Sequence, residues 1–165
     1  MAYAKKKSNE AFQKLKADLA AGQLGCAYIF YGEESYLREY YLEEVRKLLI
    51  PAGFEEFNYH KMEGKDLSVQ DLAEMAEAMP MMAEWSMVQV DDCDLSKLSE
   101  SDREVVISVL SDIPDYCTVV FTYETVNFKP DKRLKKLWDA VSKYGELVEF
   151  AKQSQRDLVA WITRH

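Results

Sequence analysis

Hydrophobic residues follow two different spacings along this chain. Apolar positions recur three and four residues apart in segments that predict helices over 9–21, 35–50, 69–79, 101–110, 132–144 and from 155 onward. Short apolar runs between these segments predict strands over 26–31, 56–61, 85–90, 116–122 and 147–150. Because strands and helices alternate, the pattern predicts an α/β fold with a parallel sheet covered by helices on both faces.

Capping and breaking residues mark the predicted helix ends. A serine or aspartate side chain can accept a hydrogen bond from the free N–H groups at a helix start. On this basis Ser8 begins the first helix, Ser101 or Asp102 the fourth, and Ser154 the last. Pro80 lacks an N–H group and ends the third helix.

The turn after the first strand has the order of a phosphate-binding loop without its chemistry. An apolar run over 28–31, a turn at Gly32 and a helix from Ser35 form the strand–turn–helix order in which nucleotide-binding domains hold phosphates. Set against the motif G-x-x-x-x-G-K-[ST], only Gly32 matches. The second glycine, the lysine and the hydroxyl residue are replaced by Leu37, Arg38 and Glu39. The sequence therefore predicts a degenerate phosphate loop.

Acidic residues support this interpretation. Glu33 and Glu34 lie where phosphate oxygens would bind, and they would repel them. Asp91 and Asp92 follow the third strand, where P-loop ATPases bind magnesium, but the neighbouring glutamate that positions water is missing. The residues thus indicate a domain that kept an ATPase fold and acts by contact, with no catalytic residue, cofactor or metal.

Two other classes of protein remain open from the residues alone. One is an active P-loop ATPase, which a nucleotide titration would identify. The other is a receiver-type phosphoacceptor domain, because acids, a hydroxyl and a lysine lie near the expected strand ends at Glu33, Glu34, Asp91, Thr122 and Lys152. A receiver has strand order 2-1-3-4-5, whereas a P-loop domain of the AAA+ type has order 5-1-4-3-2.

Charge is distributed unevenly over the 165 residues. The net charge of −8 argues against a free-standing nucleic-acid binder. Residues 53–104 carry a net −10, whereas residues 127–143 carry a net +4. The basic residues of this second region are either a solvated helix face or a contact for DNA or a partner, namely Lys132, Arg133, Lys135 and Lys136.

Other classes are disfavoured by what the sequence lacks. No apolar run is long enough to span a membrane, and no secretory signal precedes the first helix. The three cysteines form no C-x-x-C pair, so they predict reduced thiols in a cytoplasmic protein rather than a metal site.

Met81 and Met82 form an apolar pair directly after the helix that Pro80 ends. Methionine side chains are flexible and adapt to partner pockets. The pair either packs under the sheet edge or serves as a docking element. Adjacent residues of an extended loop cannot easily both face inward, so we expect at least one to be exposed.

Four pieces, in this order, resemble the delta subunit of bacterial DNA polymerase III, the clamp-loader subunit that opens the sliding clamp. They are the apolar–glycine–acidic turn at 28–37, the helix end and apolar pair at 78–82, the strand at 86–90, and the segment 155–162 after the fifth strand. The resemblance covers residues 8–165. Many members carry Leu-Phe or Phe-Phe where this chain has Met81 and Met82, which keeps the apolar volume but loses the aromatic ring.

The resemblance implies a fold, a role and partners. It implies an AAA+-like domain over 1–150, the start of a helical lid domain over 151–165, and strand order 5-1-4-3-2. Met81 and Met82 would bind the hydrophobic pocket of the sliding clamp (the beta subunit). The other expected partners are the tau/gamma and delta prime subunits, with DNA contacted only within the assembled loader. Sister subunits would use ATP, and polymerase activity would belong to the cytoplasmic holoenzyme.

Overall fold

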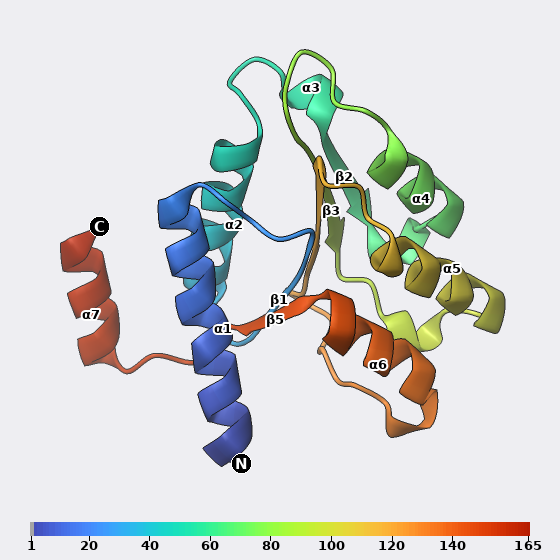
Figure 1. Cartoon of the computed structure of the whole chain (residues 1–165). Coiled ribbons are helices and arrows are strands. Elements are labelled where there is room, and N and C mark those ends of the chain that lie inside the picture. The colour runs from blue at the N-terminus through green and yellow to red at the C-terminus, as the bar shows by residue number, and fades with distance from the viewer. Residues whose placement is uncertain (1) are drawn as a thin grey trace.

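The computed structural model describes residues 2–165 and is organised around one parallel sheet (Figure 1). Its five strands are β1 (Ala27–Tyr31), β2 (Tyr59–Glu63), β3 (Ser86–Asp91), β4 (Cys117–Thr122) and β5 (Glu146–Glu149). They lie in the order β2-β3-β4-β1-β5, and every neighbouring pair is parallel. Read from the other edge, this is the predicted order 5-1-4-3-2, so that prediction is confirmed and the receiver order is excluded.

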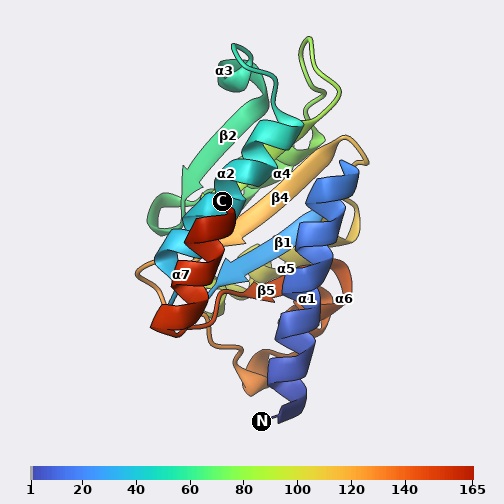
Figure 2. The same cartoon turned by 90° about the vertical axis from the view of Figure 1, so that its left-hand side faces the viewer.

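Helices cover both faces of the sheet (Figures 1 and 2). One face carries α1 (Ala2–Ala21) and α2 (Ser35–Leu49), with α7 (Gln155–Arg164) outside them. The opposite face carries α4 (Val69–Glu77), α5 (Glu100–Ser111) and α6 (Lys135–Tyr144). A short helix, α3 (Glu55–Asn58), precedes β2. This is the predicted three-layer α/β/α architecture.

Alternating strand side chains fill two separate cores. Tyr28 and Phe30 of β1 belong to the core under α1 and α2, where Phe30 packs edge-on against Phe150 with ring centroids 5.2 Å apart. Ile29, between them in the chain, belongs to the core under α4, α5 and α6. Period-two alternation therefore lets each strand bury side chains on both faces, which explains why these strands read as continuous apolar runs.

Two predicted helix starts are wrong. The first helix begins at Ala2, so Ser8 lies inside it rather than at its cap, because the alanine and lysines before Ser8 are good helix formers. The cap of α5 is Ser99, whose hydroxyl accepts from the N–H of Asp102 at 3.2 Å. Ser154 does cap α7, as predicted.

The second strand starts later than predicted. Residues 55–58 form the helical turn α3 instead of strand, and β2 begins at Tyr59. The side-chain amide of Asn58 donates to the Phe54 carbonyl at 3.2 Å, and the Glu55 carboxylate accepts from the Gly53 N–H at 2.9 Å. Such local side-chain bonds to the backbone favour a turn over an extended strand.

Two further helix boundaries differ from the prediction. The helix predicted over 132–144 starts with a 3₁₀ turn at Lys132–Leu134, so α6 itself begins at Lys135. α4 ends at Glu77, three residues before Pro80. The residue before a proline is disfavoured in helical conformation, so a boundary ahead of Pro80 is expected.

Parallel strands place the two candidate regions at opposite ends of the sheet. The Gly32 turn, Asp92 and Glu124 follow β1, β3 and β4, and Asp91 ends β3, so these residues gather at the carboxyl ends of the strands. The loop over 78–85 precedes β3, and α3 precedes β2, so both lie at the amino ends (Figure 1). The apolar pair is therefore remote from the degenerate phosphate loop.

The last helix packs on α2 through aromatic side chains. The Trp161 ring lies edge-on to Tyr36 and Tyr40, with centroid distances of 5.6 and 4.8 Å. The domain division at residue 150 stays a prediction. Among the helices of residues 2–165, none is long and apolar enough to cross a membrane.

Candidate functional site

The turn at Gly32 is packed against the segment that follows β5. Gly32 has φ of +123°, and a Cβ atom added there would lie 2.4 Å from the carbonyl oxygen and 2.8 Å from the nitrogen of Phe150. No side chain fits at that distance from backbone atoms. Gly32 is therefore required by a close internal contact.

The N–H groups of this turn bind the protein itself. The Glu34 N–H donates to the Phe150 carbonyl at 3.0 Å, and the Phe150 N–H donates to the Tyr31 carbonyl at 2.7 Å. The Glu34 carboxylate accepts from the N–H of Gln153 at 2.8 Å. In a phosphate cradle, the turn's N–H groups face the anion. Here the Glu34 N–H is already used by the Phe150 carbonyl.

Arg38, at the position of the phosphate-loop lysine, is buried and held from two sides. Only 1% of the residue is exposed, and its Nη1 donates to the Gly32 carbonyl at 3.0 Å. Its Nη2 forms an ion pair with Glu124 at the end of β4. Burial lowers the pKa of the Arg38 guanidinium, opposed by the nearby carboxylates of Glu39 and Asp92. The buried cation thus pairs with the half-exposed carboxylate of Glu124 instead of reaching a phosphate.

An acidic hollow lies beside this ion pair at the carboxyl ends of the strands. Its volume is about 210 Å³, and its carboxylates are those of Glu39, Glu63, Asp91, Asp92 and Glu124. Lys61 contributes a positive charge through an ion pair with Asp91 at 3.4 Å. The excess of negative charge opposes binding of a nucleotide triphosphate.

Asp92 has a structural role in this hollow. One oxygen of its carboxylate accepts three backbone N–H bonds, from Glu124, Thr125 and Val126, at 2.8, 2.9 and 3.1 Å. This holds the loop after β4 and brings Glu124 to Arg38. Within residues 2–165, no group of three or more His, Cys, Asp or Glu is arranged to hold a metal ion.

Met81 and Met82 are both exposed, at 57% and 81% of their surface. The sequence predicted that at least one would be. Three other large apolar residues at this end of the molecule are exposed as well: Met79 and Trp85 in the same loop, and Phe57 on α3. Exposed apolar residues that gather in one region mark interaction surfaces more often than residues scattered singly.

Asn58 supports this loop and was missed by the sequence reasoning, which placed it in a strand. It is fully buried, and its side-chain amide bonds both the N–H and the carbonyl of Met81, at 2.7 and 2.9 Å. The only signal in the sequence is a polar residue between the aromatic residues Phe57 and Tyr59. That signal does not reveal a partner 23 residues away.

Most charges of the basic segment are matched by neighbouring acids. Arg133 pairs with Asp131 at 3.0 Å, and Lys135 pairs with Asp139 at 3.7 Å. Lys136 pairs with Glu104 of α5 at 2.8 Å.

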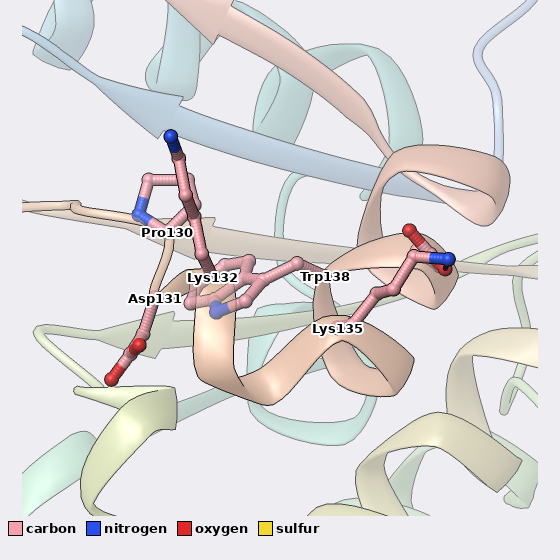
Figure 3. Close-up of a pocket in the computed structure, with 6 residues that line it drawn as sticks. Pro130, Asp131, Lys132, Lys135 and Trp138 are labelled. Carbon is pink, nitrogen blue, oxygen red and sulfur yellow. Dashed lines mark ion pairs between the residues drawn. The ribbon is translucent and has the colours of Figure 1, made fainter.

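A hollow of about 350 Å³ lies over the same segment, bounded by Pro130, Asp131, Lys132, Lys135, Trp138 and Asp139. Figure 3 shows that the ammonium groups of Lys132 and Lys135 point in different directions. They therefore do not converge on one ligand in this conformation.

The sequence matches the model of a known protein family. The family model for "DNA polymerase III, delta subunit" matches residues 28–151. The chain belongs to this family. The match includes the degenerate loop and the methionine pair. No curated protein sequence matches the chain.

Solved structures show the same fold as this delta-family chain. The DNA clamp loader delta protein of Bacillus subtilis (YqeN) superposes with a TM-score of 0.76 at 21% identity, covering 93% of this chain and 46% of that one. A DNA polymerase III gamma subunit-related protein of Thermotoga maritima gives 0.58 at 14% identity, covering 91% and 49%. A variant of Thermotoga maritima RuvB gives 0.52 at 16%, covering 97% and 49%. The chain spans about half the length of these structures.

Proposed function

We propose that this chain acts as a clamp-loader subunit in DNA replication, which binds the sliding clamp through Met81 and Met82 and favours its open form. The observation that carries the proposal is the exposure of this apolar pair in a member of the delta family. The pair lies in the loop before β3, at the amino ends of the strands.

Insertion of the pair into an apolar pocket would supply substantial binding free energy. Transferring one methionine side chain from water to an apolar site contributes about 1.5–3 kcal/mol. Anchors of this kind at the centre of an interface typically carry about 2 kcal/mol or more when truncated. Two such anchors together would contribute about 4 kcal/mol to binding.

Opening of the clamp then follows from differential affinity. A protein shifts a ring toward its open form by as much as it binds that form more tightly than the closed one. This domain needs no nucleotide for such a step, and the arrangement of Gly32, Arg38 and Glu124 supports a role without ATP hydrolysis. In this proposal the cytoplasmic partners are the clamp and the tau/gamma and delta prime subunits, and DNA is met only in the assembled loader.

The test is a clamp titration of the variant Met81→Ala, Met82→Ala. We expect its affinity for the cognate sliding clamp to fall by about a hundredfold or more, since each 1.4 kcal/mol is about tenfold. The melting temperature should change little, because both side chains are exposed. A large drop in melting temperature with unchanged affinity would show that the pair belongs to the core and that the site is wrong.

A matched control is available on α7. Val159 and Ile162 are exposed to a similar degree, at 57% and 59%. Replacing both with alanine removes exposed apolar surface far from the methionine loop. This control should bind the clamp as the unaltered chain does, so an equal loss in both variants would indicate non-specific apolar adhesion.

A further inference from the structure

We propose that Asn58 is a positioning residue, which fixes the Met81–Met82 loop in its binding conformation before any partner arrives. This inference rests on the proposed function and adds a residue that contacts the loop rather than the clamp. It also predicts a property of the free protein, namely the order of the loop.

The side-chain amide of Asn58 is fully satisfied by backbone groups. Its oxygen accepts from the Met81 N–H at 2.7 Å, and its nitrogen donates to the Met81 carbonyl at 2.9 Å and to the Phe54 carbonyl at 3.2 Å. The residue is 0% exposed. The amide therefore joins the loop before α3 to the loop before β3, with both N–H donors and its oxygen in use.

Asn58 is the main tether of the methionine loop. Among the backbone groups of residues 2–165 and the side chains of residues 10–165, the backbone of residues 79–85 makes hydrogen bonds only to this side chain. Burying a polar amide is unfavourable unless it is bonded, and two of its three bonds go to Met81. The buried Asn58 amide thus fixes the position of the loop over residues 79–85.

The backbone of Met82 shows why a tether is needed. Its φ is +56°, a left-handed conformation that non-glycine residues rarely adopt. Without a constraint on Met81, the chain can leave this conformation and relieve the strain. Fixing Met81 on both its N–H and its carbonyl holds the next residue in place, with 81% of its surface exposed.

A fixed loop binds more tightly than a fluctuating one, because a mobile segment loses conformational freedom when it docks. For Asn58→Ala we therefore expect clamp affinity to fall by about tenfold, equivalent to about 1.4 kcal/mol. Asn127→Ala, at an exposed asparagine in another loop, is the matched control and should bind normally. Asn58→Ser is a second variant in case the alanine variant folds poorly. Its hydroxyl keeps a polar group at the site but is too short to bridge both the N–H and the carbonyl of Met81, so it should also weaken binding.

Two readouts separate positioning from general stability. In hydrogen exchange, Asn58→Ala should lose protection at the Met81 N–H while β3 and β4 keep theirs. In a double-mutant cycle with Met81→Ala, Met82→Ala, the effect of Asn58→Ala on affinity should disappear, because Asn58 acts only through the methionines.

The outcomes distinguish this inference from the proposed function. If the methionine variant loses affinity while Asn58→Ala and Asn58→Ser bind normally, the positioning role is overturned and the docking site stands. If the methionine variant binds normally, the proposed site itself is wrong. Loss of protection across the whole sheet in Asn58→Ala, or additive losses in the cycle, would show a structural role only and overturn the inference.

Discussion

Replacing Gly32 with alanine tests whether the degenerate phosphate loop now serves internal packing. The added Cβ would lie 2.4 Å from the carbonyl oxygen of Phe150, 2.7 Å from its carbonyl carbon and 2.8 Å from its nitrogen. None of these atoms belongs to a flexible side chain. The backbone of residues 150–153 must therefore move for the variant to fold.

The cost can be worked out from the contacts. A non-glycine residue in such a sparsely populated backbone region costs about 1–3 kcal/mol. Moving Phe150 also breaks its bonds to Tyr31 and Glu34, at 2.7 and 3.0 Å, each contributing about 1 kcal/mol. Alanine also lowers the conformational entropy of the unfolded chain, which offsets roughly 0.4–1 kcal/mol of this destabilisation. We expect Gly32→Ala to lower the free energy of unfolding by about 3 kcal/mol.

Gly53→Ala is the matched control. Gly53 also has a positive φ, +91°, but nothing lies within 4 Å of the Cβ position. Its substitution costs backbone strain alone, about 1 kcal/mol after the unfolded-state effect. The difference of about 2 kcal/mol between the two variants isolates the contact with Phe150, since strain at a positive φ is common to both.

Urea unfolding followed by circular dichroism measures both variants. We expect a lower urea midpoint for Gly32→Ala with an unchanged slope, since a changed slope reports an altered compactness of the folded or the unfolded state. For a domain of this size each kcal/mol shifts the melting temperature by about 2–4 °C. Equal destabilisation of the two variants would refute the view that Gly32 is required by the Phe150 contact.

The remaining predictions concern the basic segment and the cysteines. Reversing Lys132 and Lys136 to glutamate should weaken DNA-stimulated clamp loading in the assembled loader, with an effect that fades as salt rises; unchanged loading would identify a solvated helix face. Burial raises the pKa of Cys93 and Cys117 to about 11 and also raises that of the half-buried Cys26. Because the thiolate is the reactive form, iodoacetamide at pH 8 should modify Cys26 first in the native protein, and mass spectrometry showing early modification of Cys93 or Cys117 would contradict their burial.

Local pattern was enough to predict most of the architecture. The apolar runs predicted the five strands, whereas their order, which matches the sheet, came from the family resemblance and not from local pattern. The adjacency of Met81 and Met82 in a loop after a helix predicted that at least one of them is exposed, and both are. These features depend on residues close together in the chain, where spacing and capping carry the information.

Features that depend on distant partners could not be read from the sequence. Arg38 looked like a poor substitute for a phosphate-binding lysine, but its partner Glu124 lies at the end of β4. In the sequence, Gly32 is the one residue that still matches the phosphate-loop motif. In the structure, its close contact with the backbone of Phe150 is what requires a glycine there. Asn58 was placed in a strand because its bond to Met81 is invisible to periodicity. In each case the decisive contact forms only when the sheet assembles.

The most direct test of the central claim is a titration of this chain with its cognate sliding clamp, with and without Mg-ATP. We predict binding of the same affinity in both conditions, and no heat when Mg-ATP is added to the chain alone. The turn at Gly32, the buried Arg38 and the acidic hollow are expected to offer no phosphate site. Absence of clamp binding, or binding that requires Mg-ATP, would contradict a subunit that holds the clamp by contact alone.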